Sequence, residues 1–124
     1  MTNCLIVGMG GFLGAVSRYL LNSIPMSNGN FPFTTMLINF IGALLIGIFT
    51  QIGSEFTNFN PQIMLFLTVG LCGGFTTFST FSLETLGLLQ DGKIFAGVSY
   101  ILFSFILCLG AVIVGKTATK MFLS

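Results

Sequence analysis

Residues 70–82 read GLCGGFTTFSTFS, and five of the seven side chains from Thr76 to Ser82 carry hydroxyl groups. Two adjacent glycines stand just before this run, in the middle of a long segment without charge. Backbone that leaves a helix at membrane depth persists only where it is buried in protein or lines a wet cavity. We therefore predict a helix that is broken near Gly73–Phe78. The alternative is a straight helix whose hydroxyl groups donate to its own carbonyls.

The composition of the whole chain places that segment in a membrane. Of 124 residues, 54% are hydrophobic and 6% are charged, whereas about 25% of residues are charged in ordinary soluble domains. A bilayer core of ~30 Å takes about 20 helical residues to cross. The charge-free runs are divided by segments rich in Pro, Gly, Asn and Ser. They predict an all-α membrane protein of one domain, residues 1–124, with four transmembrane helices at about 4–22, 33–52, 62–89 and 94–120.

Several classes of function are excluded by what the sequence lacks. Four Lys and Arg residues against three Asp and Glu give a formal net charge of +1, so there is no basic patch for nucleic acid. The chain has no histidine, which removes histidine-based catalysis and a common zinc ligand. Its three cysteines lie in apolar runs, where a thiol behaves as a small hydrophobe. We expect no nucleic-acid partner, no disulfide framework and no enzyme activity.

The positive charges are divided evenly between the two sides of the predicted spans. Lys116 and Lys120 fall on the side of the N-terminus, and Arg18 and Lys93 fall on the other. An excess of Lys and Arg in short loops sets membrane orientation, so two against two gives no consistent instruction. Either the chain inserts in both orientations, which permits an antiparallel homodimer, or weaker cues orient it. Four helices cannot easily enclose a path, so a transporting unit would be an oligomer.

Glycines recur at a spacing of four residues in two of the spans. Gly10 and Gly14 lie in the first span, and Gly70 and Gly74 lie in the third. Such ridges let membrane helices approach closely. They could join two copies of the chain or pack helices within one copy.

Polar side chains lie on matching faces of three spans. Residues three or four apart share a helix face, so Phe78, Phe81 and Glu84 form one stripe of rings and a carboxylate. The other polar candidates are Thr35 and Asn39 in the second span, Thr80 in the third, and Tyr100, Ser104 and Cys108 in the fourth. Hydroxyl, thiol and amide donors beside partly positive ring edges suit a small anion better than a cation. Alternatively, the rings only pack and the hydroxyls only join helices.

The same residues resemble a known family, the Fluc (CrcB-type) fluoride channels of bacteria. The resemblance covers the whole chain and rests on the block from Gly70 to Glu84, on Asn39, and on the pattern Gly10-Gly11-x-x-Gly14-x-x-x-Arg18. It implies a dual-topology antiparallel homodimer in the inner membrane, with two pores that both subunits line. The implied activity is passive, fluoride-selective export from the cytoplasm, and the implied cofactor is a central structural sodium ion, Na+.

The resemblance also implies roles for single residues. Phe78 and Phe81 look like the aromatic box of the pore, and Asn39 looks like the amide beside it. Gly73 and Thr76 match the positions whose backbone carbonyls, from both subunits, hold the sodium.

The remaining matches concern the path on either side of those rings. Arg18 matches a basic residue near the aqueous vestibule, and the matched members of the polar track are Thr35, Glu84, Tyr100 and Ser104. Cys108 departs from the family, because many relatives have a second hydroxyl at that position, and a thiol is a weaker donor.

Two other functions compete with a fluoride channel. Small multidrug resistance exporters also have four short spans and can insert both ways, but they need a carboxylate at the midplane of the first span. Here that span carries only Arg18, near its end. The other rival is a structural subunit whose polar residues join the helices of a larger complex. Ion flux through the purified protein separates these readings.

Overall fold

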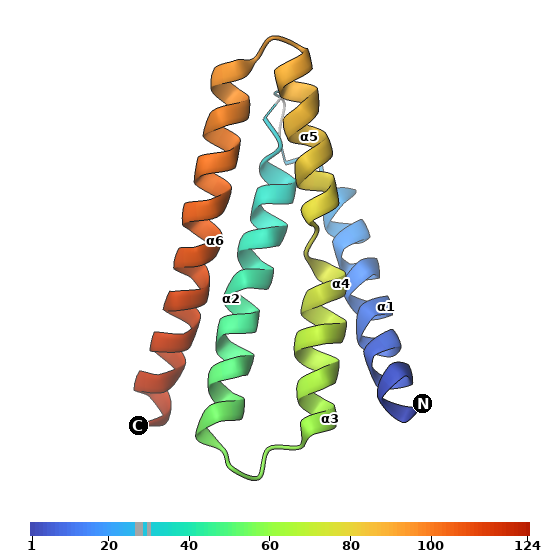
Figure 1. Ribbon diagram of the computed structural model, residues 1–124, viewed down its shortest axis with the longest axis vertical. Helices are drawn as coiled ribbons and strands as arrows, with labels where there is room; N and C mark the ends of the chain where they lie inside the picture. The colour runs from blue at the N-terminus through green and yellow to red at the C-terminus, as the bar shows by residue number, and fades with distance from the viewer. Residues whose placement is uncertain (27–28, 30) are drawn as a thin grey trace.

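The computed structural model describes residues 1–26, 29 and 31–124, and within these residues the regular structure is helical. The elements are α1 (Thr2–Asn22), α2 (Phe33–Glu55), α3 (Pro61–Met64), the π-helix η1 (Leu65–Cys72), α4 (Gly73–Phe75), α5 (Phe78–Gln90) and α6 (Ile94–Leu123). With α3 to α5 taken together, they make four segments that are long and apolar enough to cross a membrane (Figure 1). The all-α, four-span prediction is confirmed, and each boundary lies within three residues of the predicted one.

Local sequence explains how the third span begins and how it connects to the fourth. Pro61 occupies the first turn of α3, and the Asn60 side chain accepts a hydrogen bond from the Gln62 amide at 2.8 Å. Between α5 and α6, Gly92 has a φ of 75°, a conformation that glycine adopts without a steric penalty. This turn folds α5 and α6 into a tight hairpin at one end of the molecule (Figure 1).

The third span is interrupted at Thr76 and Thr77, both of which have extended backbone. Thr77 then caps α5, because its hydroxyl accepts a hydrogen bond from the Thr80 amide at 3.2 Å. The predicted break within Gly73–Phe78 is confirmed, and the straight-helix alternative is wrong. The residues before α4 form the π-helix η1, a geometry that often occurs at functional sites.

The helices pack as two pairs. α2 contacts mainly α6, and α1 contacts mainly η1 and α4, whereas contacts between the two pairs are fewer. Where α1 crosses η1, a Cβ atom at Gly10 would lie 2.5 Å from the Phe66 carbonyl oxygen and 2.9 Å from the Cα of Gly70. Two backbones can approach this closely only where side chains are missing. The predicted glycine ridges therefore pack helices within one chain.

The second pair also depends on glycine, which the sequence pattern did not indicate. A Cβ atom at Gly47 of α2 would lie 2.5 Å from the Val112 carbonyl oxygen of α6. One at Gly115 of α6 would lie 2.5 Å from the Leu44 carbonyl oxygen of α2. Close backbone approach therefore holds both pairs together.

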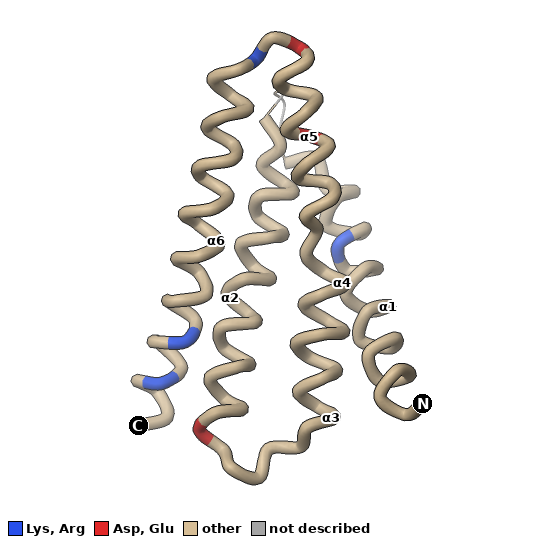
Figure 2. Tube along the Cα trace, in the orientation of Figure 1, with Lys and Arg blue, Asp and Glu red and all other residues tan. Residues whose placement is uncertain are grey.

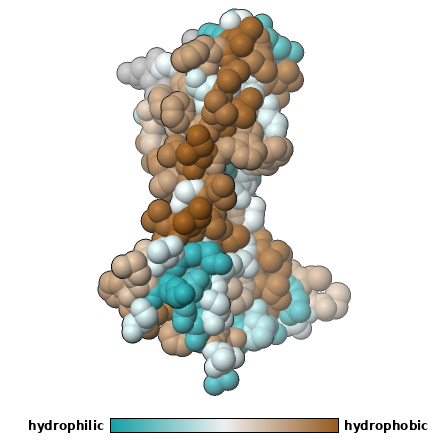
Figure 3. Space-filling model, turned by 60° about the vertical axis from the view of Figure 1, so that its left-hand side comes forward, coloured by the Kyte–Doolittle hydropathy of each residue, from teal (hydrophilic) through white to brown (hydrophobic). Residues whose placement is uncertain are grey.

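Charge and hydropathy follow the long axis of the bundle. Charged residues lie mostly toward its two ends (Figure 2), and apolar residues run along much of the height of one face (Figure 3). Both termini lie at the same end (Figure 1), so Lys116 and Lys120 near the C-terminus stand opposite Lys93 in the α5–α6 turn. The predicted division of basic charges between the two sides assumed that Lys116 and Lys120 lie at one end and Lys93 at the other.

Candidate functional site

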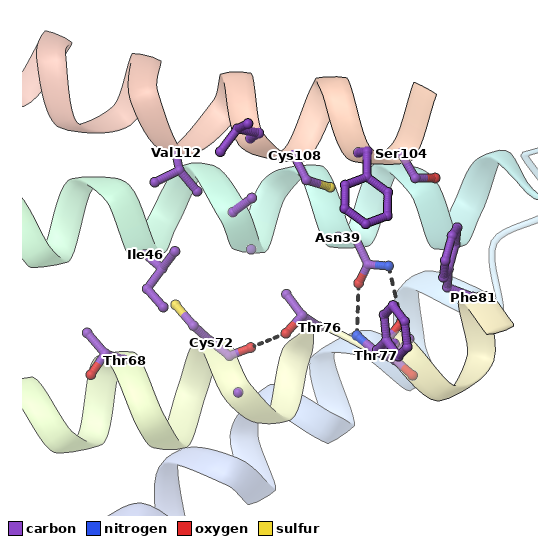
Figure 4. Close-up of a pocket in the computed structure, with 16 residues that line it drawn as sticks. Asn39, Ile46, Thr68, Cys72, Thr76, Thr77, Phe81, Ser104, Cys108 and Val112 are labelled. Carbon is purple, nitrogen blue, oxygen red and sulfur yellow. Dashed lines mark hydrogen bonds between the residues drawn. The ribbon is translucent and has the colours of Figure 1, made fainter. Parts of the chain in front are cut away.

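A groove of about 570 Å³ opens between the two helix pairs. Its walls come from α2, the broken third span and α6 (Figure 4). The predicted site residues in its lining are Asn39, Gly73, Thr76, Phe78, Phe81, Ser104 and Cys108. Apolar side chains such as Ile46 and Val112 supply much of the remaining wall. The groove thus brings together polar groups from three of the four spans.

Asn39 holds the break in place from α2. Its side-chain oxygen accepts a hydrogen bond from the Thr77 amide at 2.8 Å, and its side-chain nitrogen donates to the Thr77 carbonyl at 3.1 Å (Figure 4). One side chain therefore satisfies both backbone groups of a residue that has left the helical ladder. Asn39, an amide in an otherwise apolar span, therefore bonds to backbone groups and not to the side chain of a serine or threonine.

Ser104 lines the groove and is only 7% exposed, and its hydroxyl oxygen is buried without a hydrogen-bond partner among the described residues. Leaving a buried hydroxyl unpaired is costly, and most such groups in proteins find a partner. Cys108 follows one turn later on α6 and lines the same groove (Figure 4). The wall formed by α6 therefore contains a buried hydroxyl that is unpaired among the described residues.

Phe78 and Phe81 stand together at the start of α5, as their spacing predicted. Their ring centroids are 5.5 Å apart and the ring planes are tilted by 41°. Phe81 is buried, whereas Phe78 is 74% exposed. The two rings thus differ in role within one chain, because Phe81 belongs to the core and Phe78 projects from it.

Glu84, Thr35 and Tyr100 form a hydrogen-bonded cluster beside the groove. The Thr35 hydroxyl donates to one carboxylate oxygen of Glu84 at 2.8 Å, and the Tyr100 hydroxyl donates to the other at 2.7 Å. Tyr100 also contacts Phe81, with ring centroids 5.0 Å apart, so the cluster is joined to the groove through that ring. Thr80 lies apart from the cluster, where its hydroxyl accepts a hydrogen bond from Thr77 at 3.0 Å.

Two backbone carbonyls at the break lose their helical partners. In an α-helix the Gly73 carbonyl would accept a hydrogen bond from the Thr77 amide, but that amide donates to a side chain. The Thr76 carbonyl loses the Thr80 amide in the same way. Neutral carbonyl oxygens suit a hard cation such as sodium, so the two oxygens fit the predicted site. Within the single chain, the Thr76 oxygen accepts a hydrogen bond from Nη1 of Arg18 at 3.5 Å, which places a positive charge beside it.

Two further residues shape the site, and the sequence reasoning missed both. A Cβ atom at Gly42 would collide with the Thr76 methyl group, so this glycine lets the break approach α2. Its position three residues after Asn39, on the same helix face, was a usable signal. Phe31 contacts Tyr100 with ring centroids 5.6 Å apart. It lies in a loop, where no periodicity draws attention to a single ring.

Known proteins of one family match this chain over most of its length. The family model described as "CrcB-like protein, Camphor Resistance (CrcB)" matches residues 5–116. A protein of Ruminiclostridium cellulolyticum named "Fluoride-specific ion channel FluC" is 46% identical over 122 residues, which are 97% of this chain and 94% of the relative. Proteins of the same name from Clostridium novyi and Chlorobaculum tepidum are 43% identical over 118 residues and 48% identical over 94 residues. These alignments cover 94% and 75% of this chain, and 92% and 75% of the relatives.

The match therefore extends over both helix pairs and the break between α4 and α5. The chain is a multi-pass membrane protein and belongs to the CrcB-like protein family.

Proposed function

We propose that this protein is a fluoride-selective channel, not an enzyme, through which fluoride leaves the bacterial cytoplasm passively across the inner membrane. The observation that carries the proposal is the buried hydroxyl of Ser104, which has no partner in the described part of the chain and belongs to a residue of the groove that Phe78 and Phe81 also line. The relatives named as fluoride-specific ion channels support it.

The chemistry of the groove matches the demands of a small, strongly hydrated anion. A pore must replace the water around such an ion with several donors and still release it. The hydroxyl of Ser104 and the edges of two phenyl rings are neutral or only partly positive, so they can replace water without trapping the ion. An Arg or Lys in the same low-dielectric surroundings would hold the anion strongly.

The transporting unit that we propose is an antiparallel, dual-topology homodimer with two pores. The exposed ring of Phe78 and the open side of the groove leave the path incomplete within one chain. A second copy in the opposite orientation would close the groove and contribute its own residues, and a two-fold axis would make two such paths.

The same dimer would hold a structural sodium ion at its centre, bound by the carbonyls of Gly73 and Thr76 from both copies. Because these ligands are backbone groups, we expect Thr76→Ser to have little effect. Replacing sodium with a bulky organic cation should reduce dimer function. Unchanged fluoride flux after verified removal of sodium would remove the structural role of the ion.

The proposed function is tested by fluoride efflux from liposomes that contain the purified protein, read with a fluoride electrode. We expect rapid fluoride efflux and little chloride efflux. Phe78→Ile should lower fluoride flux at least tenfold, because the aliphatic side chain lacks the ring quadrupole. The fold should persist, because Phe78 is largely exposed in the single chain. The matched control is Phe12→Ile on α1, which is also exposed but does not line the groove. Equal flux of the two anions would exclude a fluoride-selective channel.

A further inference from the structure

Four aromatic rings form a continuous series from the loop before α2 to the groove. The ring centroids of Phe31 and Tyr100 are 5.6 Å apart, those of Tyr100 and Phe81 are 5.0 Å apart, and those of Phe81 and Phe78 are 5.5 Å apart. The last three rings belong to the groove or to the cluster beside it. Phe31 lies outside both the groove and the cluster, and neither the family resemblance nor the groove lining assigns it a role.

We propose that Phe31 is a positioning residue of the ion path, which holds the Tyr100 ring so that its hydroxyl stays on Glu84. The effect on ion flux rests on the proposed channel function, whereas the effect on Tyr100 does not. Phe31 would act through Tyr100 and would not touch the ion itself.

The geometry around Tyr100 supports this role. The residue is 0% exposed, and its hydroxyl donates to Glu84 at 2.7 Å. Its ring meets Phe31 at an interplanar angle of 78°, an edge-to-face arrangement that aromatic pairs prefer. Contact with Phe31 and with Phe81 limits how far the ring can turn, and the position of the ring fixes the direction of the hydroxyl.

Phe31 also ties this cluster to α2. Its ring centroid lies 4.6 Å from that of Phe33, the first residue of α2. Thr35, the other donor to Glu84, follows two residues later on the same helix. Phe31 therefore contacts both helices that supply hydroxyl donors to the carboxylate, and its loss should loosen both donors at once.

The chain offers a direct spectroscopic test of this role. It contains no tryptophan and two tyrosines, Tyr19 and Tyr100. In a Tyr19→Phe background, tyrosine fluorescence and ultraviolet resonance Raman spectra report Tyr100 alone. We expect Phe31→Leu and Phe31→Ile to shift the Tyr100 signal from that of a phenol bound to a carboxylate toward that of a free phenol. Phe95→Leu is the control, because Phe95 is 89% exposed near the same end of the bundle and should leave the signal unchanged.

Flux measurements test whether the contact between Phe31 and Tyr100 affects the ion path. An aromatic contact of this kind changes an equilibrium about two- to tenfold, so Phe31→Leu should slow fluoride efflux by a similar factor. Phe31→Tyr keeps the ring and should restore parental efflux. This variant is used for flux only, because it adds a tyrosine.

An unchanged Tyr100 spectrum in a folded aliphatic variant overturns the positioning of Tyr100 by Phe31. A shifted spectrum with parental flux overturns the role of Phe31 in the ion path. Loss of the folded protein in both aliphatic variants, with Phe95→Leu intact, would make Phe31 a packing residue and also overturns it. Absence of fluoride flux from the parent protein defeats the proposed function instead, and the spectra still decide whether Phe31 positions Tyr100.

Discussion

At Ser104 the protein carries a hydroxyl group that stability alone does not explain. The hydroxyl is buried without a partner among the described residues. Ser104→Ala therefore removes the free-energy penalty of an unpaired buried hydroxyl and breaks no hydrogen bond among those residues. We expect the free energy of unfolding in detergent to stay the same or rise by about 1 kcal/mol. Fluoride efflux should fall, because the wall of α6 loses its free donor.

The matched control for Ser104 is Thr85→Val. The Thr85 hydroxyl is also buried, but it donates to the Phe81 carbonyl at 2.7 Å. Its removal should lower the free energy of unfolding by about 1 kcal/mol and leave the groove unchanged. If Ser104→Ala were as destabilising as Thr85→Val, the Ser104 hydroxyl would have a partner in the working protein and would not be a free donor.

At this scale the sequence could predict which residues meet but not how they are bonded. Helix spacing placed Ser104 and Cys108 on one face and paired Phe78 with Phe81. It could not separate Thr77 from its neighbours, because the run contains five hydroxyls of similar chemistry. Only the backbone geometry shows that Thr77 caps α5.

Among the elements, the break in the third span depends on one side chain from α2. Asn39→Leu would leave the Thr77 amide and carbonyl without the two hydrogen bonds that Asn39 provides. Each unsatisfied buried group costs about 1–3 kcal/mol, so we expect unfolding to become easier by about 2 kcal/mol or more. Asn39→Asp keeps the acceptor for the Thr77 amide and, in its protonated form, a donor to the Thr77 carbonyl, so at low pH it should lose less. Denaturation in detergent measures both, and equal stability of Asn39→Leu and the parent would show that other groups hold the break.

The pairing of α1 with η1 depends on the absence of side chains. Gly10→Ala would place a methyl group 2.5 Å from the Phe66 carbonyl oxygen, so the helices must separate. The control is Gly8→Ala, two residues earlier, where an added Cβ atom meets nothing within 4 Å. We expect Gly10→Ala to lower the thermal midpoint and Gly8→Ala to preserve it or raise it, because alanine favours a helix. Equal midpoints would contradict close packing at Gly10.

Most of the elements could be predicted, because the composition or the residue spacing of their segments is distinctive. Glycines followed by hydroxyls indicated the break, and the repeat at Gly10 and Gly14 indicated close packing. The segment of the π-helix η1 is not distinctive, because its wider hydrogen-bond register uses the same apolar residues as an α-helix. Gly47 and Gly115 went unnoticed because neither has a second glycine four residues away.

For the whole molecule, the open prediction is orientation in the membrane. A cysteine introduced as Asp91→Cys in the α5–α6 turn, in a Cys4→Ser background, should be labelled from both sides in roughly equal amounts. The reason is that the basic residues are divided two against two between the two ends of the predicted spans. A membrane-impermeant quencher separates the two populations. Label on one side alone would rule out dual topology and favour a parallel assembly.

Composition and spacing are enough to predict the fold of one chain, but not how copies of the chain assemble. Span lengths and turns follow from composition, whereas the partner of an exposed ring such as Phe78 does not. Two copies, a lipid surface and a larger complex would each cover that ring. Measurements on the assembled protein distinguish which of the three contacts the Phe78 ring.

The interleaved pairing of helices also sets the order in which the chain can be completed during translation. α1 packs on the third span and α2 packs on α6, so the first two helices enter the bilayer before either main partner has been made. Their glycine faces must first lie against lipid or the insertion machinery. A gene split in the loop between α2 and α3 would put one member of each pair in each fragment. Neither fragment could then bury its own glycine face, and the two would have to be co-expressed to recover the fold.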